Sequence, residues 1–408
     1  MDIFHLFSVL IVLSAGFAYI NFRFLKLPNP IGLMLVSLIF SLIIILIGQI
    51  YPPLRDLLTS NIKSIDFSEL LLEGMLSFML FAGAIHIKYE DLKSERLAIL
   101  LFSTVSVILS TFIVGFVTFK LLNFFGMEVQ FVHALLFGAL ISPTDPIAVL
   151  SILKSAGVSK SLETKIAGES LFNDGVAVVV FITILKLAQP GAEIELNTVL
   201  TLFGQEAIGG IILGMIIGVI GYKLIVRIDN YQVEVLITLA IVMGGYTLAH
   251  FIHVSGPLAM VAAGVITGNH GKEFGMSAVT SEYIDKFWEL IDEILNAILF
   301  VLIGLELLIV QSNFTIFFIS LLLIFITLIT RYISVYVPSL LIRLKEKITQ
   351  RTLFILTWGG LRGGISIALA LSIPAEFGRE IWVTITYIIV CFSILVQGMT
   401  IGKFAKEK

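Results

Sequence analysis

Long apolar segments recur along the whole chain, and they constrain its fold more than any other feature. Most are about 20 residues long, enough to cross roughly 30 Å of hydrocarbon as a helix. Because a membrane interior has no water for unpaired backbone groups, such a chain is expected to form an all-α polytopic membrane protein. The polar loops separate about 13 transmembrane helices, at 3–22, 30–51, 68–87, 97–119, 131–153, 163–187, 198–222, 234–250, 255–269, 287–310, 314–342, 352–374 and 381–402.

Composition excludes a soluble protein. The chain is 58% hydrophobic and only 13% charged, whereas soluble domains are about a quarter charged. The single cysteine, Cys391, cannot form an internal disulfide, and no phosphate-binding GxxxxGK[ST] motif occurs. We therefore expect the lipid bilayer as a partner, no nucleic acid, no nucleotide, no cofactor, no enzyme activity and no soluble regulatory domain in residues 1–408.

The basic residues predict the orientation in the membrane. Of the 26 Lys and Arg residues, 19 belong to one set of alternate loops and the C-terminus, and five belong to the other set. Cytoplasmic loops carry the excess of positive charge. The first apolar segment lacks a preceding basic region, so it is expected to be a retained helix and not a signal peptide. We therefore expect a cell (inner) membrane protein with its N-terminus outside and its C-terminus in the cytoplasm.

Two of the predicted helices should be broken at their midpoints. Helix 5 contains Ser-Pro-Thr-Asp-Pro at 142–146, and two prolines three residues apart do not fit a continuous helix. Helix 12 contains four glycines and an arginine at 359–364. Helices 5 and 12 run antiparallel, so helices 1–6 and 8–13 are predicted to be inverted repeats joined by helix 7. Interrupted helices at matching positions in two halves indicate the binding site of a transporter.

Helix 6 carries a polar cluster at membrane depth. Ser170 and Asp174 share one helix face, and Glu169 and Asn173 share the adjoining face. Each centrally placed acid costs about 2.5–3.5 kcal/mol to insert, so Asp174 near the middle of the span indicates a functional site. Glu169 lies nearer the basic loop and is equally well explained as a structural residue.

Asp145, Arg362 and Arg331 each have more than one possible role or partner. Asp145 either ligates an ion or caps the half-helix that follows Pro146, while Thr144 offers a hydroxyl and a carbonyl to a hard cation. Arg362 cannot lose its proton, so its partner should be Glu169, Asp145 or the carbonyl end of a half-helix. Arg331 in helix 11 either extends toward the interface or pairs with an acid such as Asp91 or Glu95.

Two further patterns predict local packing. Helix 7 contains the glycines Gly204, Gly209, Gly210, Gly214, Gly218 and Gly221, which indicate close contact between helices. The first half of helix 10 contains Glu289, Asp292, Glu293 and Asn296, which we expect at an interface or in an inner funnel.

Four motifs together resemble NhaP-type sodium/proton antiporters of the first monovalent cation:proton antiporter family. They are FGALISPTDP at 137–146, GESLFNDG at 168–175, FVLIGLE at 300–306 and WGGLRG at 358–363, and the resemblance extends along the whole chain. It implies a core of 97–187 and 314–402 that moves against a scaffold and dimerisation unit of 1–87 and 198–310, within a homodimer. It also implies that Na⁺ binds at Asp174, Ser170 and Thr144, assisted by Asp145, that Asn173 shapes the site and that Glu169 pairs with Arg362. Some relatives have a further acid near the position of Ala82, which cannot ligate.

The predicted function is exchange of Na⁺ or Li⁺ for H⁺, by competition at Asp174 with alternating access. Because Asn173 cannot take up a proton where electrogenic relatives have an aspartate, we expect an electroneutral 1:1 exchange. The partners are then a monovalent cation and a proton. The alternatives left open are a K⁺/H⁺ antiporter of the same fold, a cation channel and an intramembrane hydrolase.

Overall fold

The structure is a computed structural model, and it describes residues 3–53, 67–189, 191, 196–274, 276–310, 313–342 and 348–405. Almost all of these residues are helical. Within this part of the chain, nine helices are long and apolar enough to cross a membrane, and two shorter apolar helices accompany them. The predicted all-α polytopic fold is confirmed.

Several predicted segments consist of more than one helical piece. Helix 3 contains a π-helical turn, helix 4 has a short kink near Thr104, and a short helix follows helix 3. The elements are α1 (Ile3–Ile20), η1 (Asn21–Leu25), α2 (Asn29–Ile50), α4 (Phe67–Glu69), η2 (Leu70–Met75), α5 (Leu76–Ile85), α6 (Tyr89–Ser94), α7 (Arg96–Ser103), α8 (Val105–Phe124), α9 (Phe131–Ile141), α10 (Ile147–Ser155), α11 (Lys160–Leu187), α12 (Leu196–Ile225), α13 (Tyr231–Phe251), α14 (Gly256–Phe274), α15 (Ala278–Leu305), η3 (Glu306–Leu308), α16 (Phe314–Ile342), α17 (Gln350–Trp358), α18 (Gly364–Leu371), η4 (Ala375–Phe377), α19 (Arg379–Phe392), η5 (Ser393–Gln397) and α20 (Gly398–Ala405).

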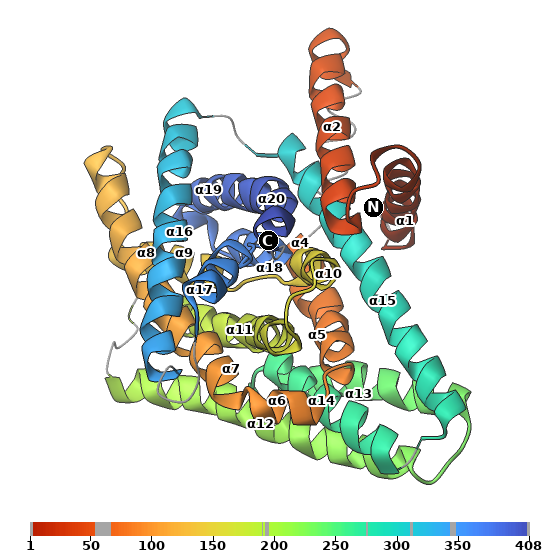
Figure 1. The fold of residues 1–408 in the computed structure, drawn as a ribbon. Coiled ribbons are helices and arrows are strands. Elements are labelled where there is room, and N and C mark those ends of the chain that lie inside the picture. The colour runs from red at the N-terminus through yellow and green to blue at the C-terminus, as the bar shows by residue number, and fades with distance from the viewer. Residues whose placement is uncertain are drawn as a thin grey trace.

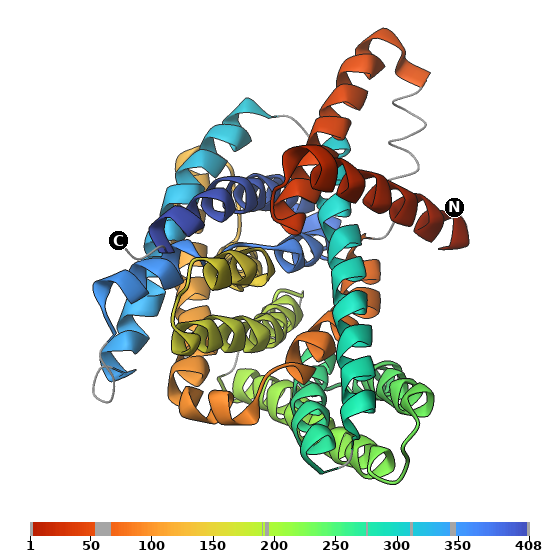
Figure 2. The same ribbon diagram turned by 45° about the vertical axis from the view of Figure 1, so that its right-hand side comes forward.

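The short half-helices lie in the middle of the bundle. In Figure 1, α8 and α16 lie on one side, α15, α2 and α1 lie on the other, and α10, α11, α17 and α18 lie between them. Figure 2 shows α15 running along the flank of this central group, beneath α1 and α2. Polar residues in the half-helices are therefore enclosed by apolar helices on several sides.

Glycines bring α12 close to its neighbours. A Cβ atom at Gly210 or Gly214 would collide with the backbone oxygen of Ser255 or Ala259, so α12 and the start of α14 touch through their main chains. Gly209, Gly218 and Gly221 also face close neighbours, whereas Gly204 faces open space. The prediction of close packing by the helix 7 glycines is confirmed for five of the six.

Both predicted helix breaks are present. The helix ends at Ile141 and resumes at Ile147 in one half, and it ends at Trp358 and resumes at Gly364 in the other. The two extended segments meet in a single antiparallel bridge, in which the Asp145 backbone N–H donates to the Leu361 carbonyl at 2.8 Å. This hydrogen bond pairs a backbone donor of one unwound segment with a backbone acceptor of the other. The two segments cross inside the bundle.

Candidate cation site at the helix crossing

Helix α11 is joined to the first unwound segment through Thr144. The Ser170 hydroxyl donates to the Thr144 carbonyl. The Asn173 amide donates to the Thr144 hydroxyl at 2.8 Å, and its oxygen accepts from the Thr144 N–H at 3.4 Å. All three residues are at least 95% buried. Asn173 therefore shapes the unwound segment by bonding to the backbone N–H and the hydroxyl of Thr144.

Asp174 is the acid beside this cluster that has no committed partner. Its carboxylate makes no hydrogen bond or ion pair with any residue in the described ranges, and it is only partly buried. It lies close enough to Asp145 for the two carboxylates to interact electrostatically. A partly accessible carboxylate next to buried hydroxyl and carbonyl oxygens is suited to binding a dehydrated cation or a proton.

Asp145 occupies the start of α10. Its side-chain oxygen accepts from the Ile147 N–H at 2.9 Å, which satisfies one free donor at the N-terminus of the half-helix. A Cβ atom at Gly363 would collide with the Asp145 carboxylate, so this carboxylate also lies against the chain just before α18. Asp145 is thus placed between the positive ends of two half-helix dipoles.

Glu169 pairs with Arg331, and this corrects the predicted partner. The Arg331 guanidinium on α16 lies 2.6 Å from the Glu169 carboxylate, with side chains 5% and 2% exposed. Arg362 instead donates to the carbonyls of Ser142 and Pro143, at 2.6 and 2.9 Å, which confirms the carbonyl end of a half-helix, the third of its expected partners. The reason is geometric, because Arg362 reaches the free carbonyls at the end of α9 and α16 brings Arg331 to the acid.

Arg331 also holds the end of the second broken helix. It donates to the Leu356 carbonyl at 3.1 Å, in the last turn of α17. The two acids considered for it have other partners: Asp91 pairs with Lys160 at 2.8 Å, and Glu95 pairs with Lys165 at 3.0 Å. Each broken helix therefore has an arginine at the carbonyl end of its first half, where the helix dipole is negative.

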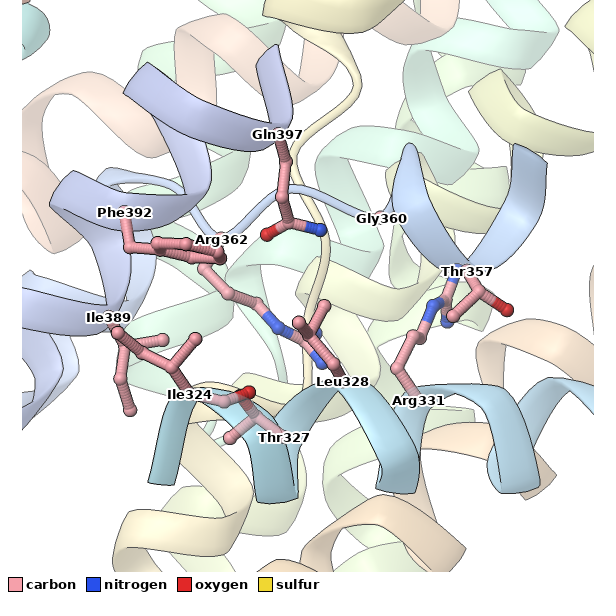
Figure 3. A pocket seen from close by; sticks show the side chains of 10 residues that line it. All are labelled: Ile324, Thr327, Leu328, Arg331, Thr357, Gly360, Arg362, Ile389, Phe392 and Gln397. Atoms are coloured by element: carbon pink, nitrogen blue, oxygen red, sulfur yellow. The ribbon is translucent and has the colours of Figure 1, made fainter. Parts of the chain in front are cut away.

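The two arginines line one small cavity. Figure 3 shows Arg331 extending from α16 and Arg362 extending from the segment after α17, which also contains Gly360. A Cβ atom at Gly360 would lie 2.7 Å from the Arg331 side chain. Glycine at this position therefore lets a guanidinium approach the unwound backbone.

Sequence reasoning missed the polar support of Arg362. Its backbone N–H donates to the Ser393 hydroxyl at 2.9 Å, which donates in turn to Gln397 at 2.7 Å. Gln397 then donates to the Trp358 carbonyl at the end of α17, at 2.9 Å. Ser393 and Gln397 are four residues apart in an apolar helix, and this spacing was the available signal.

The charges at the crossing leave room for one positive charge. Two arginines face three acids, Glu169, Asp145 and Asp174, so the fully ionised cluster carries one net negative charge. Among the residues that the structure describes, no group of three His, Cys, Asp or Glu side chains could hold a metal ion. The arrangement instead suits a monovalent ion bound by hard oxygen atoms.

Comparison with known proteins shows the family of the chain. The family model described as the transmembrane sodium/hydrogen exchanger matches residues 9–407. The chain belongs to the sodium/hydrogen exchanger family. It is 47% identical to the Na⁺/H⁺ antiporter NhaP of Pseudomonas aeruginosa, across 98% of this chain and 96% of that protein. It is 32% identical to the Na⁺/H⁺ antiporter NhaH of Halobacillus dabanensis, across 100% and 98%.

The same fold occurs in a solved structure. The structure of the sodium proton antiporter MjNhaP1 from Methanocaldococcus jannaschii matches with a TM-score of 0.73, across 98% of this chain and 96% of that one. The sequences are 20% identical, so this match concerns the fold alone. The resemblance read from the four motifs is confirmed, and the exchanger is a multi-pass membrane protein.

Proposed function

We propose that this exchanger moves Na⁺, and also Li⁺, against H⁺ by letting the two ions compete for the Asp174 carboxylate. The observation that carries the proposal is the position of Asp174, which forms no hydrogen bond or ion pair in the described structure and lies beside the crossing. Relatives that match nearly the whole chain are named Na⁺/H⁺ antiporters, which supports this choice of ions.

The bound cation would take its ligands from α11 and the unwound segment. Asp174 supplies charge, the Ser170 hydroxyl has free lone pairs while it donates to Thr144, and Thr144 supplies oxygen atoms. Asn173 positions Thr144, and Asp145 contributes to the local field from its capping position. A proton on Asp174 removes the charge that the cation needs, so only one ion binds at a time.

Transport then requires the site to face each side in turn. We propose that the core, 97–187 and 314–402, moves against the scaffold, 1–87 and 198–310, in a homodimer. Supporting this division, α16 packs on α8 and α19, whereas α14 packs on α5 and α12. The excess of basic residues on one set of loops supports a cytoplasmic C-terminus and an outside N-terminus in the cell (inner) membrane.

The charge balance supports electroneutral 1:1 exchange. Glu169 is paired with Arg331, and Asp145 caps a half-helix, which leaves Asp174 as the acid that cycles. Its protonated and Na⁺-bound forms carry the same charge. One net charge per cycle would shift the balancing ion ratio by roughly 50-fold per 100 mV, because the potential acts at about 2.3 kcal/mol per charge. Equal charge in both half-cycles predicts no shift.

Reconstituted protein tests both parts of the proposal. Proteoliposomes with opposed Na⁺ and H⁺ gradients should reach balance at the same ratio with and without a K⁺ potential clamped by valinomycin. A balance point that follows the voltage contradicts 1:1 exchange and makes Asp145 or Glu169 a second proton carrier.

One variant tests the proposed mechanism, in which a single carboxylate binds both ions. Asp174→Asn keeps the shape of the side chain and removes its charge, so it should abolish Na⁺-driven proton flux in a protein that still folds. Glu163→Gln, in the first turn of the same helix, is the matched control and should exchange normally. Substantial flux in Asp174→Asn contradicts the mechanism.

The same assay separates the alternative functions. Offering Na⁺, Li⁺ and K⁺ in turn distinguishes the proposed exchanger from a K⁺/H⁺ antiporter of this fold. Cation flux without counter-movement of protons would indicate a channel. Proteolysis abolished together with transport by Ser170→Ala would indicate an intramembrane hydrolase.

A further inference from the structure

A second polar pair faces the crossing from the scaffold helix α15. Asp292 and Asn296 lie one turn apart near the middle of this helix. They share a face with Trp288 and Leu299, whose side chains are 0% and 1% exposed. The pair therefore points into the protein rather than toward lipid.

Asn296 contains a buried oxygen with no partner. The residue is 5% exposed, and its amide nitrogen donates to the Asp292 carbonyl at 2.8 Å. Its side-chain oxygen accepts no hydrogen bond from any residue in the described part of the chain. A buried acceptor left without a donor is costly, so such an atom requires a ligand or an ordered water.

Packing places this pair next to the ion site. Helix α15 contacts α18, and a Cβ atom at Gly364 would collide with Leu299, one turn after Asn296. The preceding residue, Gly363, lies against Asp145. The Asp292 and Asp145 carboxylates are close enough to interact electrostatically across this contact. An ion at Asp292 would therefore be adjacent to the crossing.

We propose that Asp292 and the side-chain oxygen of Asn296 form a second site for the transported monovalent cation, from which it passes to Asp174. The donor set is one carboxylate and one neutral amide oxygen, which are hard ligands of the kind that Na⁺ and Li⁺ prefer. The other groups that interact electrostatically with Asp292 are His86 and Glu293, besides Asp145. His86 contacts Asp285 at 3.4 Å, two turns before Asp292 on α15.

This inference rests on the proposed function, because it assigns the same cation a second position. The site lies on the scaffold, whereas Asp174 lies on the core. Movement of the core would carry Asp174 away from Asp292 and Asn296. The second site can therefore pass the cation to Asp174 in only one of the two states of the transporter, facing one side of the membrane. The loop before α15 belongs to the set of loops rich in Lys and Arg, which is the cytoplasmic set. The second site therefore acts in the state that is open to the cytoplasm.

The test compares Asp292→Asn with a matched control on the same helix. Glu293→Gln removes the same charge one residue away, from a side chain that is exposed. Proton flux driven by cytoplasmic-side Na⁺ is measured over a range of concentrations in proteoliposomes. We expect Asp292→Asn to raise the half-saturating Na⁺ concentration about tenfold with the maximal rate within twofold of the parent, and Glu293→Gln to leave both unchanged.

A direct measurement of Na⁺ binding tests the second site without requiring transport. Calorimetric titration with NaCl, against choline chloride at equal ionic strength, is applied to Asp174→Asn. We expect a weak Na⁺ signal that disappears in Asp174→Asn/Asp292→Asn and in Asp174→Asn/Asn296→Leu. The Asn296→Leu variant keeps the carboxylate and the side-chain volume, so it still tests the site if Asp292→Asn does not fold.

The outcomes distinguish this inference from the proposed function. Absence of Na⁺-driven flux in the parent protein overturns the function itself. Normal exchange in the parent, with an Asp292→Asn half-saturation within twofold of it or matched by Glu293→Gln, overturns the second site alone. A complete absence of Na⁺ binding to Asp174→Asn overturns it as well.

Discussion

The Glu169–Arg331 ion pair allows a quantitative prediction, because neither charged side chain can reach water when its partner is removed. The charged atoms are 2.6 Å apart, and the side chains are 2% and 5% exposed. Breaking a buried pair costs about 3–5 kcal/mol. Glu169→Gln retains an acceptor for the guanidinium and should lie near the lower value. Arg331→Met also loses the hydrogen bond to the Leu356 carbonyl and should lie near the upper one.

Removing both charges should cost far less than the two single changes together. If the sites were independent, the double variant would lose about 8 kcal/mol, the sum of the single costs. We expect no more than about 5 kcal/mol, which corresponds to a coupling of roughly 3 kcal/mol. Denaturant unfolding of the purified proteins in detergent, followed by tryptophan fluorescence, measures each term.

Arg362 provides the control for this cycle. It donates to the carbonyls of Ser142 and Pro143, and within the described structure no hydrogen bond or ion pair joins it to the Glu169 carboxylate, although it lies within the field of that carboxylate. The coupling of Arg362→Met to Glu169→Gln should therefore stay below about 1 kcal/mol. Equal coupling of Glu169 to both arginines, or additive losses in the Glu169–Arg331 pair, would refute the assignment.

Further predictions concern the crossing itself. Gly363→Ala should lower both exchange and thermal stability, since its Cβ atom would collide with the Asp145 carboxylate, and a normal melting temperature would show that the segments do not pack as described. Asp145→Ala should cost about 1 kcal/mol of stability through the lost cap, and loss of Na⁺ binding in a protein that unfolds normally would show that Asp145 ligates the ion. Asn173→Leu should abolish exchange by releasing Thr144, and unchanged Na⁺ half-saturation in this variant would contradict its positioning role.

The broken helices were predictable because their cause is local. Pro143 and Pro146 lack backbone donors, and the glycines at 359–364 weaken the helix wherever the segment lies. The capping role of Asp145, one of its two predicted alternatives, is likewise visible in the order of three residues. Such effects act within one or two turns, so the rest of the fold is not needed to predict them.

The choice among the partners expected for Arg362 could not be derived in this way. Glu169, Arg331 and Arg362 all carry charges that require neutralisation, and the sequence allows either arginine to reach the acid. The choice depends on the position of α16 relative to α11, and on the carbonyl end of α9 facing Arg362. A charge requires compensation, but carbonyl groups compensate a guanidinium as well as a carboxylate does.

The sequence by itself determined the class of fold, the two breaks and the residue types at the crossing, because hydrophobic length, proline and glycine act on the chain locally. Only the tertiary structure decided which polar groups meet. The contacts of Thr144 with Asn173, of Glu169 with Arg331 and of α15 with the crossing join segments from 29 to well over 100 residues apart. Their geometry follows from how whole helices pack. In an apolar bundle many helix faces are equally apolar, so the sequence of a face does not identify the helix that packs on it.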